Sequence, residues 1–139
     1  MDEYKILFQG ALPAYNSEAT VYTCPAEAKS EVTKGSTVTT NPLVASRVTQ
    51  TMVTSIVACN TRSSTAAANV TIFLYPDQAT LTDHANDATY ALVFLNSVAS
   101  RTFNTYNFGL YMSPGSILTA SGYLADTVSL NILGIETTV

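Results

Sequence analysis

One short segment holds most of the residue types that do chemistry. Residues 77–87 contain three aspartates, Asn86 and the only histidine of the chain, His84. With backbone carbonyls, these side chains approach the roughly six to eight oxygen ligands that Ca²⁺ takes. Asp, Asn and Thr are also the usual residues of a solvated turn. We therefore interpret 77–87 as a surface loop and expect no metal site.

Catalytic arrangements can be drawn from the same residues, but no motif supports them. A Ser-His-Asp triad would combine His84 with Asp83 or Asp87 and a serine, yet no nucleophile-elbow motif surrounds any serine. A glycosidase needs only two carboxyl groups across a cleft, whereas the acidic residues here fall in expected loops and near the chain ends. We expect no enzyme activity, no catalytic residue and no cofactor.

The two cysteines, Cys24 and Cys59, lie far apart and form no CxxC metal or redox motif. Each lies in or beside an apolar, strand-like run, so we interpret both as buried free thiols that pack as small hydrophobic side chains. A disulfide between them is the alternative.

Tyrosine is the most frequent aromatic residue, and most copies fall at expected strand ends or in loops. Tyrosine is favoured where one end of the ring is packed and the other is hydrated, as at subunit and sugar-binding interfaces. We interpret these side chains chiefly as sheet-surface residues, with an interface role as the alternative. They are Tyr15, Tyr22, Tyr75, Tyr90, Tyr106, Tyr111 and Tyr123.

The charge content excludes several classes of protein. Only 12% of the 139 residues are charged and the net charge is −4, so no basic patch is available to bind nucleic acid. No apolar run approaches the roughly 20 residues of a membrane span, and the acidic start Met1-Asp2-Glu3 does not predict a secretory signal.

A small domain with so few surface charges tends to self-associate, so we expect an oligomer or a subunit of a larger assembly.

Short apolar runs alternate with Gly, Pro, Asn, Asp and Ser clusters, which is typical of strands and turns. Val128, Leu130 and Ile132 alternate with polar residues and are expected to point inward. The segments 47–59 and 69–75 are the two predicted strands with the strongest signal for a hairpin. The predicted strands are 5–8, 19–24, 47–59, 69–75, 89–95, 102–108, 116–121 and 126–133, with a further hairpin within 28–40.

The segment 47–59 is apolar on both faces, with Val53 and Val57 expected opposite Met52 and Ile56. This pattern indicates a central strand that is covered on both sides, or covered by a partner subunit. About eight strands of this kind predict an all-β fold, an antiparallel β-sandwich that is jelly-roll-like, with an immunoglobulin-like sandwich as second choice.

The order of several segments resembles small virion structural proteins of tailed bacteriophages, including many from cyanophages. In these proteins a "Tyr-Thr-x-Pro-Ala" motif precedes a "Ser-x-Ile-x-x-x-Asn" motif and a closing strand that ends near "Gly-x-Glu". The present chain departs from the pattern between Glu27 and Thr51, where an extra hairpin or loop is expected. The segments that carry the resemblance are 5–11, 19–26, 53–60, 69–74 and 126–136.

The resemblance implies a β-sandwich that assembles on the phage particle, as a homotrimer, and implies no catalytic residue. The expected function is a capsid decoration or cement protein that binds the major capsid protein or other virion proteins. The expected location is the virion, after synthesis in the bacterial host cytoplasm. A neck, tail or fibre-attachment component is the alternative. A carbohydrate-binding module is the rival from another class, although the chain has no Trp to stack on a sugar.

The N-terminal residues 1–15 are expected to form an arm outside a single sandwich domain of residues 16–139. Such an arm can add a strand to the open sheet edge of a neighbouring subunit, so its deletion should weaken attachment and leave the domain folded. The partner-binding residues expected in it are Tyr4, Ile6, Leu7, Phe8 and Tyr15.

Overall fold

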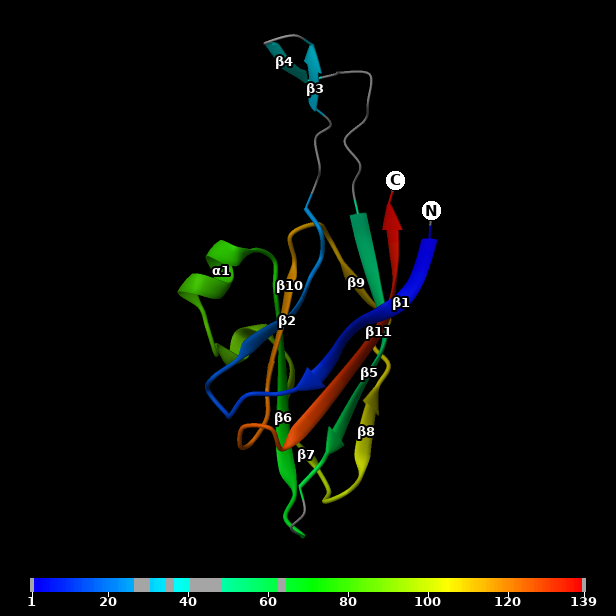
Figure 1. Cartoon of the computed structure of the whole chain (residues 1–139). Coiled ribbons are helices and arrows are strands. Elements are labelled where there is room, and N and C mark those ends of the chain that lie inside the picture. Colours follow the sequence, from blue (N-terminus) through cyan, green and yellow to red (C-terminus); the bar gives the residue numbers. More distant parts are fainter. Residues whose placement is uncertain (1, 27–30, 35–36, 41–48, 63–64, 139) are drawn as a thin grey trace.

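Strands make up most of the chain, and they form two packed antiparallel sheets (Figure 1). The computed structural model describes residues 2–26, 31–34, 37–40, 49–62 and 65–138. The predicted all-β sandwich is confirmed, because each sheet buries one apolar face against the other. The finer assignment to a jelly roll stays a prediction.

The five-stranded sheet has the order β1-β11-β5-β8, with β9 pairing a separate stretch of β5. The first and last strands of the chain are neighbours, so both termini lie at the same end of this sheet (Figure 1). The strands are β1 (Asp2–Ala11), β11 (Val128–Thr138), β5 (Thr49–Asn60), β8 (Phe103–Tyr106) and β9 (Leu110–Met112).

The four-stranded sheet has the order β2-β10-β6-β7. Its strands are β2 (Ala19–Thr23), β10 (Ile117–Ser121), β6 (Ala68–Tyr75) and β7 (Ala91–Val98). The helix α1 (Gln78–Asp83) and the 3₁₀ turn η1 (Ala88–Tyr90) connect β6 to β7. The predicted hairpin within 28–40 is confirmed as β3 (Glu31–Lys34) paired with β4 (Thr37–Thr40), while residues 35–36 lie outside the described residues.

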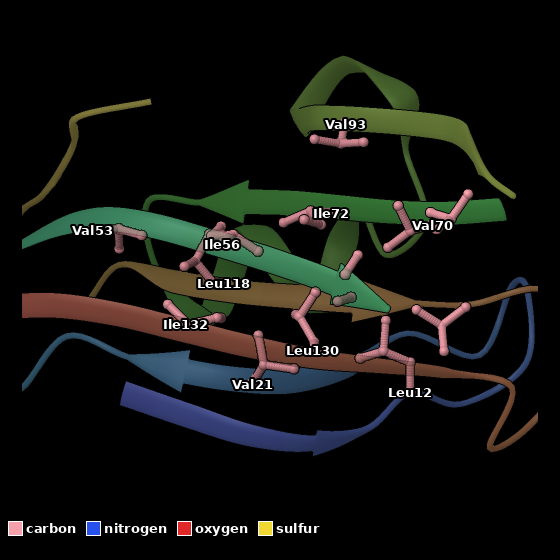
Figure 2. Packing of buried hydrophobic residues seen from close by; sticks show 14 of the residues in the cluster. Leu12, Val21, Val53, Ile56, Val70, Ile72, Val93, Leu118, Leu130 and Ile132 are labelled. Carbon is pink, nitrogen blue, oxygen red and sulfur yellow. The ribbon is translucent and has the colours of Figure 1, made fainter. Parts of the chain in front are cut away.

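The core lies between the two sheets. Each sheet contributes fully buried side chains to it (Figure 2). The five-stranded sheet contributes Leu130 and Ile132 of β11 and Ile56 of β5, and the four-stranded sheet contributes Ile72 of β6 and Leu118 of β10. The alternation predicted for the start of β11 is therefore confirmed, with Val128, Leu130 and Ile132 inward and the polar residues between them outward.

The N-terminal segment is part of the sandwich, which corrects the expectation of an arm outside the core. Residues Asp2 to Ala11 pair along β11, and Leu12 lies in the core with 1% of its surface exposed. The cause is that Leu7, Phe8 and Leu12 bury apolar surface against the core only when the segment pairs along the sheet.

Two β-bulges in the five-stranded sheet change which side chains share a face, and the one in β1 leaves Leu7 as an extra residue between Ile6 and Phe8. In β5, Val53 pairs with Gly134 and Ser55 with Leu133, so Thr54 is an extra residue in the ladder. Val53 and Ile56 consequently both point into the core, while Met52 and Val57 point outward. The predicted opposition of Val53 and Val57 to Met52 and Ile56 is therefore wrong.

The predicted hairpin of 47–59 and 69–75 is also wrong, because β5 and β6 belong to different sheets. The buried side chain of Asn60 helps to hold the crossing between them. Its Nδ2 donates to the carbonyl oxygens of Ala66, at 3.2 Å, and Val98, at 3.0 Å. These two bonds satisfy backbone groups at a corner where the ladder ends.

Candidate functional site

The outward side of the five-stranded sheet is apolar. Side chains of directly paired residues point to the same side of an antiparallel sheet, so the register fixes which residues share it. We call this surface the outer face. Its apolar residues are Tyr4, Ile6, Met52, Val57, Cys59, Phe103, Tyr111, Leu133 and Ile135.

Five of these side chains are strongly exposed. The exposed fractions are 65% for Phe103, 63% for Tyr4, 59% for Ile6, 55% for Tyr111 and 43% for Met52. At roughly 200 Å² for each large side chain, they present about 600 Å² of surface. That value is at the upper end of the roughly 300–600 Å² found for the largest apolar patch of a typical monomer.

The outer face carries almost no charge. The charged residues of the five strands are Asp2, Glu3, Lys5 and Glu136, and only Asp2 lies on the outward side. Asp2 is the first residue of β1, and its carboxylate accepts a 2.7 Å hydrogen bond from the Thr137 hydroxyl. The polar residues between the apolar ones are neutral, which lowers the free energy needed to remove this face from water.

The predicted partner-binding residues divide into three groups. Tyr4 and Ile6 lie on the outer face, as an interface role requires. Leu7 is the extra residue of the β1 bulge, and both Leu7 and Phe8 pack against the core. Tyr15 lies elsewhere, in a hollow beside the other sheet.

This hollow has a volume of about 380 Å³. Its walls come from the loop before β2, the start of β6, the strand β7 and the loop after β10. It is lined by Tyr15, Asn69, Leu95, Tyr123 and Leu124.

The walls of the hollow are held in place before any ligand arrives. The Tyr15 amide donates to the Tyr123 carbonyl oxygen at 3.3 Å, and the Gly122 amide to that of Pro13 at 2.8 Å. The Arg62 guanidinium lies 5.4 Å from the centre of the Tyr123 ring, a cation–π distance. These contacts fix the orientation of one tyrosine ring and the spacing between the two loops.

Leu95 in the wall of the hollow has a strained backbone, with φ of 49°. It lies in the β7 bulge, and its amide donates to the buried Thr71 hydroxyl at 3.2 Å. A non-glycine residue in this conformation costs on the order of 1 kcal/mol, and such residues concentrate at functional sites.

A polar cluster joins the two sheets from the inside. The Tyr22 hydroxyl donates to Glu136 at 2.6 Å and lies 2.7 Å from the Thr51 hydroxyl. The Lys5 ammonium lies 2.5 Å from the second Glu136 oxygen. The Cys24 thiol lies 3.4 Å from the Thr51 hydroxyl and donates to nearby backbone carbonyls. The hydrogen bonds of these groups are made to one another and to backbone.

The pKa values in this cluster favour a structural role. Burial alone would raise the pKa of Glu136, but hydrogen bonds from Lys5 and Tyr22 and the positive charge of Lys5 together lower it. Burial and the Glu136 hydrogen bond raise the pKa of Tyr22. Burial also raises the pKa of the Cys24 thiol, which keeps it protonated and a poor nucleophile.

Two of the three aspartates of the segment 77–87 act as helix caps. Asp77 accepts the Thr80 amide at 2.7 Å at the start of α1, and Asp87 accepts the Thr89 amide at 2.9 Å at the start of η1. These hydrogen bonds lower the pKa of both carboxyl groups. His84 lies 3.4 Å from Asp87. Across the described ranges of the chain, no three His, Cys, Asp or Glu residues are grouped to hold a metal ion.

Glu18, in the loop before β2, holds the segment that connects β6 to β7 through hydrogen bonds. Its carboxylate accepts hydrogen bonds from the Asn86 amide at 2.7 Å, from the Tyr75 hydroxyl at 3.0 Å and from the Thr119 hydroxyl. Burial, followed by the Glu18 hydrogen bond, raises the pKa of Tyr75 to about 12. Sequence reasoning missed this cluster because Glu18, Tyr75 and Thr119 are distant in the chain and match no local motif.

Both cysteines are free thiols, as predicted, but the prediction that both are buried is confirmed only for Cys24. Cys24 is fully buried beside the polar cluster, whereas Cys59 is half-buried on the outer face. The two lie on opposite sides of the five-stranded sheet.

Comparison of the chain with protein-family models, curated proteins and solved structures finds no match. None of the helices in the part of the chain that the structure describes is long and apolar enough to cross a membrane.

Proposed function

We propose that this protein is a non-enzymatic structural component of a phage virion, and specifically a capsid decoration or cement protein. The observation that carries the proposal is the outer face, a wide apolar sheet surface with a single charge at its margin. The resemblance to small virion proteins of tailed phages supports the same function. A neck, tail or fibre-attachment role is the alternative within this class.

The outer face suits a protein that acts by binding other proteins rather than by catalysis. A decoration protein stabilises a shell by adding buried surface across the seams between capsomers, and apolar area supplies that stabilisation at about 25 cal/mol per Å². The sandwich beneath the face is rigid because both sheets pack on one core. A rigid platform loses little conformational entropy when it binds.

The test is to locate the protein on particles. Particles of the phage that encodes the chain are purified by density-gradient sedimentation and imaged by cryo-electron microscopy. The chain should sediment with full heads, and density for the sandwich should lie on the capsid surface. Density at the neck or tail would establish the alternative, and particles that lack the chain would contradict the whole class.

A binding measurement distinguishes specific attachment to the particle from mere co-sedimentation of the protein with it. Particles made without the chain should bind the added protein, and Phe103→Asp on the outer face should reduce the amount bound. Phe94→Asp is the matched control, since Phe94 is 49% exposed on β7 of the other sheet. Equal losses for both variants would mean that the outer face is not the surface that matters.

The hollow favours a second candidate function, carbohydrate binding. Two tyrosine rings, the Asn69 amide and the neighbouring Arg62 provide stacking surfaces and hydrogen-bonding groups in a space of about 380 Å³. A glycan array followed by NMR titration tests it. Saturable shifts that Tyr123→Ala removes and Tyr111→Ala does not would support a sugar site, and no saturable shift with any glycan would dismiss it.

A further inference from the structure

We propose that a second copy of this chain covers the outer face, with two five-stranded sheets packed face to face about a two-fold axis. The inference rests on the proposed function and deepens it: the outer face makes the contact between two copies, and the pair is the unit that attaches to the capsid. The observations that carry it are the area, the charge and the side-chain pattern of the outer face.

The area is close to what a stable pair needs. Interfaces of standard size bury roughly 800 Å² on each partner. The five strongly exposed side chains supply about 600 Å² at roughly 200 Å² each. Val57, Cys59, Leu133 and Ile135 lie half-buried between them and add to that sum.

The charge distribution selects this face for contact between copies. Each chain carries a net charge of −4, so two copies repel one another over most of their surfaces. On the outer face only Asp2 is charged, and it lies at the margin. A neutral surface is compatible with itself, which a two-fold interface requires because the same patch is present on both sides.

The pattern of side-chain sizes allows two such faces to interlock. The large residues Tyr4, Phe103 and Tyr111 stand on outer strands of the sheet, and Ser55 and Ser129 bring small side chains to β5 and β11 between them. Stacked sheets lie about 10 Å apart with side chains interdigitated, so large groups of one copy need small positions on the other. The pair would resemble a second sandwich core.

Sedimentation of the purified full-length chain at micromolar concentration tests the pairing. The wild-type protein should have twice the chain mass of 14.8 kDa. Phe103→Asp should raise the dissociation constant about 100-fold or more, because two-fold symmetry buries two carboxylates without partners. Phe94→Asp, the matched change on the other sheet, should leave the mass doubled.

A second measurement uses the unaltered protein, so that a misfolded variant cannot leave the question open. Cys59 is the more accessible of the two thiols, and it lies on the outer face. Its rate of alkylation should fall several-fold as the protein concentration rises through the dissociation constant. A rate that is independent of concentration would overturn the pairing.

Other outcomes are equally decisive. A monomer at micromolar concentration, a mass of three chains, or a dimer that survives Phe103→Asp would overturn the two-fold pairing. A monomer that is nevertheless found on particles would leave the proposed function standing. A dimer of a chain that is missing from particles would support the pairing and contradict the proposed function.

Discussion

The Tyr22 hydroxyl on β2 donates a 2.6 Å hydrogen bond to Glu136 on β11, which links the two sheets of the sandwich side chain to side chain. The other Glu136 oxygen faces the Lys5 ammonium on β1. The two outermost strands at this end, one from each sheet, are thereby tied to the same carboxylate. The polar cluster therefore resists separation of the sheets where the apolar core ends.

Tyr22→Phe removes only the hydroxyl of this link. We expect the free energy of unfolding to fall by about 1–3 kcal/mol, since the hydrogen bond is made to a charged group in a half-buried site. Urea denaturation followed by circular dichroism measures the change. Tyr15→Phe is the control, because Tyr15 is 43% exposed, and it should change stability by far less. Equal effects for the two variants would contradict the structural role of the link.

The lowered pKa of Glu136 predicts a dependence of stability on pH. A carboxyl group whose pKa is lower in the folded chain than its ordinary value of 4.5 contributes stability above that value. The contribution is lost as the pH falls from about 4.5 through the folded pKa. Unfolding free energies measured from neutral pH to about pH 3 should therefore fall less steeply in Glu136→Gln than in the wild type.

Lys5→Met provides an independent check on the cause of this pH dependence. Burial raises the pKa of Glu136, and the Lys5 hydrogen bond is the largest of the influences that lower it, followed by the Tyr22 hydrogen bond and the Lys5 charge. Without Lys5 the folded pKa of Glu136 should rise toward or above its ordinary value, so the acid-dependent loss of stability should shrink. An unchanged pH profile in Lys5→Met would show that other carboxyl groups cause the acid sensitivity.

Gly134 lies on β11, between Lys5 of β1 and Val53 of β5 and close to the bulges of both strands. A Cβ atom at this position would stand 2.6 Å from the Leu7 side chain and 2.7 Å from the Met52 carbonyl oxygen. The backbone oxygen cannot move without disturbing the β5–β11 ladder, so Gly134→Ala should destabilise the fold by roughly 1–3 kcal/mol. A thermal unfolding scan measures this. Gly134→Ala with Leu7→Ala should recover only part of the loss, because the Met52 contact remains.

The regular parts of the fold could be predicted from the sequence because they follow local periodicity. Val128, Leu130 and Ile132 alternate with polar residues over the start of β11, and a period of two determines which side chains are buried. The Asp-rich segment 77–87 predicts a surface loop, whereas the structure has the short helix α1 there, and Asp77 and Asp87 cap α1 and η1. The turns themselves were missed because they are too short to show a helical period.

The outer face could not be delimited in the same way, because two bulges interrupt the period. One extra residue at Thr54 brings Val53 and Ile56 to the same side, and another at Leu7 turns Leu7 and Phe8 toward the core. A bulge depends on pairing with a distant strand, which a single sequence does not reveal. The apolar character of 47–59 on both faces was nevertheless the correct signal that β5 has a second apolar side.

Deletion of residues 1–15 should unfold the protein, contrary to the expectation for a free arm. The deletion removes β1, uncovers β11 and takes Leu12 out of the core. Loss of Leu12 alone, in Leu12→Ala, should cost about 2–5 kcal/mol. Circular dichroism and limited proteolysis of the truncated chain test this. A truncated chain that stays folded and resists protease would mean that β1 is dispensable for the sandwich.

Glu18→Ala should loosen the connection between β6 and β7 more than it loosens the core. The carboxylate accepts the Asn86 amide at 2.7 Å as well as the Tyr75 and Thr119 hydroxyls, so its removal leaves a backbone donor and two buried hydroxyls with fewer partners. Hydrogen exchange of the Asn86 amide should accelerate about tenfold or more. The Ile72 amide in β6 reports global opening and should accelerate less. If both amides accelerate equally, Glu18 acts on the whole fold, and if neither does, the hydrogen bonds to Glu18 do not hold the connection.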